Sequence, residues 1–425
     1  MNSTIRSDFL HILTSRGFLH QATDLEALDA LLANNPAQTA YIGFDATATS
    51  LHVGSLIAIM MLRHLQQAGG RPIVLMGGGT SLVGDPSGKD EARKMLTRAD
   101  INNNIDGIKR VFAHYIDFNN DRALLLDNAD WLLSLSYIDF LRDIGRHFSV
   151  NKMLQMDSVK TRLAREQNLS FLEFNYMVLQ AFDFMTLHKN HDCILQMGGS
   201  DQWGNIGMGV DLTRRLHNSE QGTRVFGLTA PLLTTATGAK MGKTAAGAVW
   251  LSGELLSAYD FWQFWRNCDD ADVGRFLKLF TELPLADISK LEKLQGQELN
   301  EAKKILADEI TCLCHGRAAA AAARQTADAV FGGMAGNNLA NLPTITISNR
   351  DITDKKIGLL AVMHQLGFAE SNSAARRLVE QGGVRLKGQV VTDPQLIIDD
   401  RLFGDDQQLD LQVGKKKHGL IKREK

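Results

Sequence analysis

Two glycine-containing loops hold side chains suited to binding a phosphate. The first loop, residues 45–55, contains His52 and Gly54 ahead of an apolar helix. Free amides at a helix start favour a phosphate, the histidine can donate to it, and the glycine lets a flat ring approach the backbone. The second loop, residues 240–244, has two lysines that could stabilise the charge of a departing pyrophosphate. Taken alone, such residues are more often a satisfied surface histidine and a solvated basic loop.

A strongly apolar helix with one polar stripe is a third candidate. Tyr176, Gln180 and Asp183 fall at i, i+4 and i+7 within residues 175–184, where most other residues are apolar. The Asp183 carboxylate could accept a hydrogen bond from a hydroxyl, whereas Tyr176 and Gln180 could hold an amino group. A plain exposed face would produce the same pattern.

Two further loops follow predicted strands and each contains a carboxylate. Asp85 lies in residues 84–89 and Asp201 in residues 198–203. Either could hold an ammonium group or a ribose hydroxyl, although Asp-Pro-Ser-Gly is also a strong turn sequence. Cys312, Cys314 and His315 offer three close ligands against the four of a structural zinc site, so no metal centre is predicted.

The elements between these loops predict a parallel α/β sheet. Strand 40–44, helix 56–68 and strand 72–76 form a βαβ unit. Residues 90–190 look mostly helical, and strand 193–197 then resumes the sheet. The loops therefore follow the carboxyl ends of parallel strands, where α/β folds bind ligands.

The rest of the chain divides by composition. We expect a catalytic domain over 1–250 with a helical insert at about 90–190, an α-helical domain over 251–330, a linker over 331–352 rich in Gly, Asn and Ala, and a small α+β domain over 353–425. The last domain contains predicted helices at 357–367 and 373–381 and a tight hairpin around Lys387-Gly388.

Composition and charge exclude several classes of protein. The 425 residues are 44% hydrophobic and 22% charged, which excludes disordered, collagen-like and disulfide-scaffold proteins. With a net charge of −2, the protein as a whole cannot bind nucleic acid through its overall charge. In 353–425, however, 13 Lys and Arg against 10 Asp and Glu give +3, leaving −5 elsewhere, which suggests an appended nucleic-acid module. Four unpaired cysteines, a charged N-terminus and short apolar runs predict a soluble cytoplasmic protein without membrane contact.

Together and in this order, the motifs resemble those of the bacterial tyrosyl-tRNA synthetases, which are class I aminoacyl-tRNA synthetases. The resemblance extends through the whole chain and is strongest at residues 41–45, 84–88, 140–151, 196–205 and 240–244. It implies a Rossmann-type core that activates L-tyrosine with ATP to tyrosyl-adenylate and pyrophosphate, then transfers tyrosine to the terminal ribose of its tRNA. It further implies Mg²⁺ on the ATP phosphates, no protein-bound metal, a homodimer formed through the insert, and RNA binding by the last domain.

The resemblance also assigns residues. Tyr41 and Asp183 would bind the phenol, Asp85, Tyr176 and Gln180 the ammonium group, and Gln202 would lie near the carboxylate. The ATP-binding set would be Gly43, Asp45, Gly54, Gly199, Asp201 and Lys243. The residues acting on the phosphates would be His52, Ser55, Lys89, Arg93, Lys240, Lys243 and Thr244. The RNA-binding set would be Arg376, Arg377, Arg385, Lys387, Lys415, Lys416 and Lys417.

Three positions depart from the family pattern. Ser55 replaces the second histidine of the signature, Ile42 a frequent cysteine, and Ala58 a threonine. We expect a working enzyme that depends more on His52 and the lysine loop. The alternatives are a tryptophan-specific or other related nucleotidyltransferase and a non-catalytic RNA-binding relative, which only Ser55 favours. A dinucleotide oxidoreductase would need Gly-x-Gly-x-x-Gly after a strand, and the chain lacks it.

Overall fold

A computed structural model of the chain describes residues 5–85, 96–217, 224–236, 238, 241–244, 247–331, 342–348, 357–403, 407–414 and 417–424. The chain forms two compact units. The first comprises residues 1–242, 250–252 and 268–302, and the second comprises residues 243–249, 253–267 and 303–425. Each unit is described separately.

A six-stranded sheet forms the centre of the first unit, in the order β1-β6-β5-β2-β3-β4. Every neighbouring pair from β6 to β4 is parallel, and only the short β1 pairs antiparallel at the edge. The strands are β1 (Gln21–Ala22), β2 (Thr39–Phe44), β3 (Arg71–Met76), β4 (Leu124–Asp127), β5 (Cys193–Gly199) and β6 (Phe226–Ala230). The chain leaves β2 toward β3 on one side, while β5 lies on the other, so the strand order reverses beside β2.

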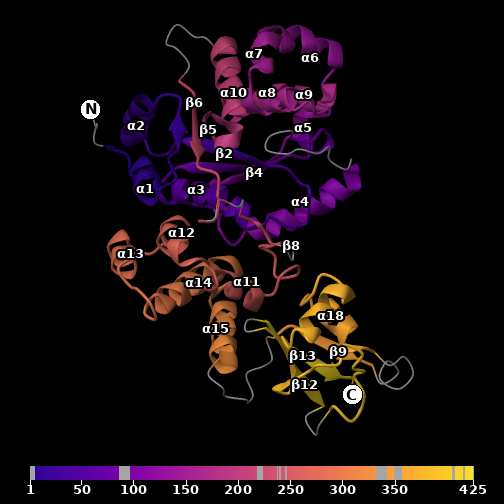
Figure 1. Ribbon diagram of the computed structural model, residues 1–425. Helices are drawn as coiled ribbons and strands as arrows, with labels where there is room; N and C mark the ends of the chain where they lie inside the picture. Colours follow the sequence, from indigo (N-terminus) through magenta and orange to yellow (C-terminus); the bar gives the residue numbers. More distant parts are fainter. Residues whose placement is uncertain are drawn as a thin grey trace. The chain divides into compact units, whose positions relative to one another are not determined.

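Helices cover both faces of this sheet, as Figure 1 shows for α9 and α10 on one side and α1, α3 and α4 on the other. The alternation of side chains along β2 explains the two layers. Tyr41 packs against Phe184 of α9, with ring centroids 5.6 Å apart, whereas Phe44 packs against Phe112 of α4 at 4.8 Å. The helices are α1 (Asp8–Arg16), α2 (Leu25–Asn34), α3 (Leu56–Gln67), α4 (Arg98–Phe112), α9 (Phe171–His191) and α10 (Trp203–Leu216). The predicted βαβ unit is confirmed.

The expectation of a mostly helical segment over 90–190 needs one correction. Leu124–Asp127 forms strand β4, which pairs in parallel with β3 and extends the sheet. Three consecutive leucines have no period that separates a strand from a helix, so pairing with β3 decides the outcome. The helices that follow are α5 (Ala129–Leu132), α6 (Tyr137–Asp143), α7 (Val150–Leu154) and α8 (Asp157–Ala164). Helices α6, α7 and α8 pack with α9 and α10 around an apolar cluster that includes Ile144, Met153, Val159 and Met177.

Helices α12 (Val273–Phe280) and α13 (Leu285–Leu291) complete the first unit. The second unit contains the strand pair β7 (Lys243–Thr244) and β8 (Gly247–Ala248), together with α11 (Ala258–Arg266) and α15 (Arg317–Phe331). Helix α14 (Leu299–His315) passes from the first unit into the second. The predicted helical stretch that ends near residue 330 is confirmed.

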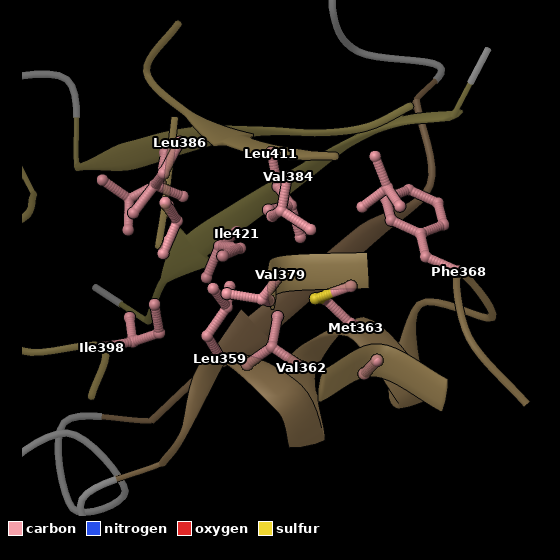
Figure 2. Close-up of a cluster of buried hydrophobic side chains, with 14 of the residues drawn as sticks. Leu359, Val362, Met363, Phe368, Val379, Val384, Leu386, Ile398, Leu411 and Ile421 are labelled. Atoms are coloured by element: carbon pink, nitrogen blue, oxygen red, sulfur yellow. The ribbon is translucent and has the colours of Figure 1, made fainter. Parts of the chain in front are cut away.

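The C-terminal part of the second unit has its own core, drawn in Figure 2. A five-stranded sheet in the order β11-β10-β12-β13-β9 packs its apolar face against two short helices. The elements are β9 (Thr344–Ile347), α17 (Leu359–Gln365), α18 (Asn372–Glu380), β10 (Val384–Leu386), β11 (Gln389–Val390), β12 (Gln408–Val413) and β13 (Lys417–Arg423). Lys387 and Gly388 both have positive φ, +49° and +78°, as a two-residue hairpin turn requires. The hairpin predicted there is confirmed.

Candidate active site

The predicted ligand-binding residues gather at one edge of the first unit's sheet. Parallel strands place their carboxyl ends together, and the loops that contain Asp45, Asp85 and Asp201 follow β2, β3 and β5. Helix α9 adds the stripe with Tyr176, Gln180 and Asp183 above the same edge. This is the position at which α/β sheets bind ligands.

A buried carboxylate and a buried hydroxyl lie at one end of the site. Asp183 is 2% exposed and accepts a hydrogen bond at each oxygen: Trp131 Nε1 donates to Oδ1 at 2.7 Å and Asn128 Nδ2 donates to Oδ2 at 2.9 Å. The hydroxyl of Tyr41 is fully buried and has no hydrogen-bond partner among the residues that the structure describes. A buried hydroxyl without a partner is costly, so a ligand that pairs with it gains free energy.

Burial perturbs both groups. It raises the pKa of Asp183 to about 7, with the charges of Asp45 and Asp127 adding to the rise and the two donors opposing it. Burial raises the pKa of Tyr41 well above its ordinary value, and the nearby charge of Asp183 raises it further. The pair therefore offers a hydroxyl that stays protonated and a carboxylate that titrates near neutrality.

Asn128 and Trp131 contact the candidate site through Asp183 and were not predicted from the sequence. The amide oxygen of Asn128 accepts from the backbone N–H of Gly79 at 2.8 Å, so this side chain joins the glycine turn after β3 to Asp183. Asn128 follows β4 directly, and Trp131 lies in the next helix, α5. Recognition of Leu124–Asp127 as a strand would have placed them at the ligand-binding edge.

A chain of hydrogen bonds joins the residues predicted to hold the ammonium and carboxylate groups. Gln202 Nε2 donates to Asp85 Oδ2 at 2.9 Å. Asn205 Nδ2 donates to Gln202 Oε1 at 3.1 Å and to Gln180 Oε1 at 2.9 Å. Asn205 is 5% exposed and was not predicted as a site residue. Its amide fixes the orientation of both glutamines, because both present their carbonyl oxygens to it.

Asp45 lies beside the stripe on α9. Its Oδ1 accepts from the Tyr176 hydroxyl and from Thr80 Oγ1, each at 3.2 Å. Asp45 was predicted to bind ATP, and these contacts place its carboxylate next to a residue of the predicted tyrosine-binding set. Asp45 therefore links the residues predicted to bind ATP to those predicted to bind tyrosine.

Two of the glycines predicted at the nucleotide lie near the carboxyl ends of β2 and β5. Gly43 is the one exposed residue of β2, and a Cβ built there would meet nothing within 4 Å. Gly199 ends β5, and a Cβ there would lie 2.5 Å from Asp201 Oδ1. The Asp201 side chain is exposed. The absence of a side chain at Gly43 therefore leaves the surface open near the end of β2, and the exposed Asp201 side chain follows the neighbouring strand β5.

The histidine loop and the beginning of the lysine loop are in direct contact. The N–H of Gly54 donates to His52 Nδ1 at 3.0 Å, which leaves the proton of a neutral ring on Nε2. A Cβ on Gly54 would lie 2.6 Å from His52 Cε1, and a Cβ on Gly242 would lie 2.7 Å from His52 Nδ1. Ser55 is partly buried at the start of α3. The lack of side chains at both glycines therefore lets the two loops enclose the imidazole ring.

Several predicted residues can be placed only in part. Lys243 and Thr244 form the short strand β7. Lys89, Arg93, Lys240, Lys415 and Lys416 lie outside the described residues. Among the described residues, no group of three His, Cys, Asp or Glu side chains could hold a metal ion, and no helix is long and apolar enough to cross a membrane.

The remaining predicted RNA contacts lie on the surface of the C-terminal part. Arg376, Arg377, Arg385, Lys387 and Lys417 are all exposed. Arg377 and Lys417 line a common surface groove together with His364 and Phe368. This groove places two cations beside an aromatic ring.

The sheet order, the carboxylates at the strand ends and the histidine loop at a helix start define a nucleotide-binding α/β protein of the Rossmann type. Comparison with known proteins is more specific. Residues 33–332 match the family described as tRNA synthetases class I (W and Y), and residues 357–402 match the S4 domain. The chain belongs to this synthetase family, as the sequence motifs predicted.

Individual relatives agree with this assignment. The chain is 57% identical to the tyrosine–tRNA ligase of Beijerinckia indica, over 98% of this chain and 97% of the relative. It is 55% identical to the tyrosine–tRNA ligase of Paracoccus denitrificans, over 99% of both chains. The crystal structure of a C-terminally truncated mitochondrial tyrosyl-tRNA synthetase from Aspergillus nidulans matches with a TM-score of 0.68 and 31% identity, covering 77% of this chain and 95% of that one.

Proposed function

We propose that the chain is a tyrosine–tRNA ligase, which activates L-tyrosine with ATP and transfers the tyrosyl group to the terminal ribose of its tRNA. One observation carries the choice of amino acid: the carboxylate of Asp183 and the hydroxyl of Tyr41, which has no partner among the described residues, are buried at the same end of the site. A substrate phenol can donate to Asp183 while it accepts from Tyr41.

The same pair explains discrimination against other aromatic amino acids. Phenylalanine has no hydroxyl, so its binding would leave both buried polar groups without a ligand partner. The indole N–H of tryptophan could donate to Asp183, but indole offers no acceptor for the hydroxyl of Tyr41. Tyrosine is the only one of the three that satisfies both.

In the activation step, a carboxylate oxygen of tyrosine forms a bond to the α-phosphorus of ATP. The bond from that phosphorus to the bridging oxygen breaks, and pyrophosphate leaves with its negative charge. His52 can donate from Nε2 to a phosphate oxygen, because Nδ1 is occupied by Gly54. We assign Ser55, Thr244 and the cations Lys89, Arg93, Lys240 and Lys243 to the same phosphates, where they act most strongly as pyrophosphate leaves.

We place the ATP ribose at Asp201 and the adenosine against Gly43, Gly54 and Gly199. Mg²⁺ would arrive on the phosphates of ATP, because this ion keeps substrate phosphates among its ligands. Asp85, Tyr176 and Gln180 would hold the ammonium group of tyrosine, with Gln202 near its carboxylate. The hydrogen bonds through Asn205 support a fixed arrangement of these side chains.

We assign tRNA binding to the predicted domain over 353–425, which contains the S4 match. Arg377 and Lys417 in the common groove, together with Arg376, Arg385, Lys387, Lys415 and Lys416, would contact phosphates. Such contacts position RNA without selecting its sequence. The proposed catalytic domain over 1–250 and helical domain over 251–330 differ from the two compact units, because residues 268–302 belong to the first unit. The proposed linker over 331–352 is shortened by β9 (Thr344–Ile347), which pairs with β13 in the C-terminal sheet.

We further propose a homodimer in the cytoplasm. Large apolar side chains are exposed across the helical insert, among them Tyr137 at 60%, Ile138 at 68%, Val150 at 59% and Phe171 at 68%. A concentration of exposed apolar residues in one segment is typical of a protein interface. All four cysteines are free thiols, which suits a reducing compartment.

The direct test is ATP–pyrophosphate exchange with tyrosine, phenylalanine and tryptophan side by side, followed by charging of a tRNA pool. We expect exchange with tyrosine alone, a large loss in Lys243→Ala and a smaller loss in Ser55→Ala. Exchange with tryptophan but not tyrosine, an inactive wild type, or an unaffected Lys243→Ala would refute the proposal.

A further inference from the structure

The loop between β2 and α3, which leads to His52, is held by hydrogen bonds along its backbone. The N–H of Ala46 donates to the buried Ser81 Oγ at 2.8 Å. Further along, the N–H of Leu251 donates to the carbonyl of Leu51 at 2.9 Å. The N–H of Ser252 also donates to Ser50 Oγ at 3.1 Å, so the loop is held at both ends.

Helix α4 meets the loop at Ala46 and Thr49 through two residues on one face. Asn104 is 8% exposed, and its Nδ2 donates to the carbonyl oxygen of Ala46 at 2.8 Å. Gly107 follows three residues later, on the same face of the helix. A Cβ built on Gly107 would lie 2.0 Å from the carbonyl oxygen of Thr49 and 2.8 Å from its carbonyl carbon. The loop backbone therefore rests directly on the helix where a side chain is missing.

The glycine is costly for the helix itself. A glycine inside a helix destabilises it by about 1 kcal/mol relative to alanine. Helix α4 is otherwise well built, since Thr97 and Asp100 form a complete capping box and Ile101, Ile105 and Ile108 are buried. The close approach of Thr49 is the structural reason for Gly107.

We propose that Asn104 and Gly107 are positioning residues for ATP, which act through residues 46–49 on His52 without touching the substrate. The inference rests on the proposed function, because it assigns the histidine loop to the phosphates. Ordinary contact between carbon and oxygen needs more than 3 Å, so a methyl group at Gly107 must displace the Thr49 carbonyl by about 1 Å. His52 lies three residues further along the same loop. Misplacement of a reacting group by about 1 Å can reduce a rate by about 100-fold.

The test separates ATP from tyrosine. In Gly107→Ala we expect kcat/KM for ATP in pyrophosphate exchange to fall by about 10-fold to 100-fold. The dissociation constant for tyrosine, measured by equilibrium dialysis without ATP, should stay within about two-fold, because Asn104 and Gly107 meet the loop backbone at Ala46 and Thr49. A merely structural role would weaken both ligands together or neither.

Gly207→Ala is the matched control. Gly207 also lies inside a helix, α10, but a Cβ there would meet nothing within 4 Å. This variant should keep both ligand constants and melt at a slightly higher temperature. Asn104→Ala removes the hydrogen bond to the same loop without adding a methyl group. If Gly107→Ala does not fold, this variant alone tests whether α4 positions the loop. We expect a smaller rise in KM for ATP, about five-fold, again without loss of tyrosine affinity.

Wild-type ATP kinetics in both variants, or a parallel loss of tyrosine affinity, would overturn the inference while leaving the proposed function intact. An inactive wild type would instead refute the proposed function.

Discussion

Replacement of Trp131 by phenylalanine tests the role of the buried carboxylate. The change keeps an aromatic ring but removes the N–H that donates to Asp183 Oδ1 at 2.7 Å. That donor favours the ionised form of a carboxylate whose pKa burial has already raised to about 7. Its removal therefore raises the pKa of Asp183 further, so that more of the enzyme has a protonated Asp183 at neutral pH.

The size of the effect follows from the hydrogen bond. A bond to a charged group contributes about 1.5–3 kcal/mol, equivalent to a factor of about 10 to 100 in the proton affinity of Asp183. If the phenol donates to the carboxylate, the proton must leave before tyrosine binds. Tyrosine affinity should then fall by about 10-fold to 100-fold relative to the wild type at pH 6, and the two proteins should converge as the pH rises to 9.

Equilibrium dialysis or calorimetry with tyrosine between pH 6 and 9 measures this ratio. Phenylalanine is the internal control, because it has no phenolic proton to donate, and its weak binding should change by the same small factor at every pH. The KM for ATP should remain constant. A loss of tyrosine affinity that is independent of pH, or no loss at all, would refute the assigned role of Asp183.

Four further outcomes are expected. In the wild type, tyrosine affinity should decrease as the pH falls below about 7, by up to about ten-fold per pH unit, with proton release detectable by calorimetry in buffers of different ionisation enthalpy. Arg162→Met should lower stability by about 3–5 kcal/mol in chemical unfolding, because it removes the cation that faces the charge of Glu173 in an ion pair whose side chains are 5% and 13% exposed. Ile138→Asp should shift sedimentation at micromolar concentration from dimer to monomer, and a wild type that sediments only as a monomer would contradict the homodimer. Arg377→Ala should weaken tRNA binding and reduce its salt dependence by about one phosphate contact, without change in pyrophosphate exchange.

Much of the architecture was predictable from local patterns. Strand 40–44, helix 56–68 and strand 72–76 have unambiguous periods and turn signals, and the hairpin at Lys387-Gly388 has the chemistry that its turn requires. The strand Leu124–Asp127 was not predictable, because three leucines have no period. Without that strand, nothing in the sequence placed Asn128 and Trp131 at the site. Local sequence cannot indicate a strand whose stability comes from pairing with a distant neighbour.

The sequence by itself determined which groups are available: the carboxylates after the strands, the histidine and lysine loops, and the polar stripe on one helix. Spacing along a helix or after a strand is a local property, so these groups could be found without a structure. Only the tertiary structure decided their surroundings. Burial raised the pKa of Asp183 to about 7, and among the described residues the buried hydroxyl of Tyr41 has no partner. Packing also brought Gly107 against the loop of His52. Desolvation and close approach depend on residues far apart in the chain, which is why the sequence could name the site but not its electrostatics.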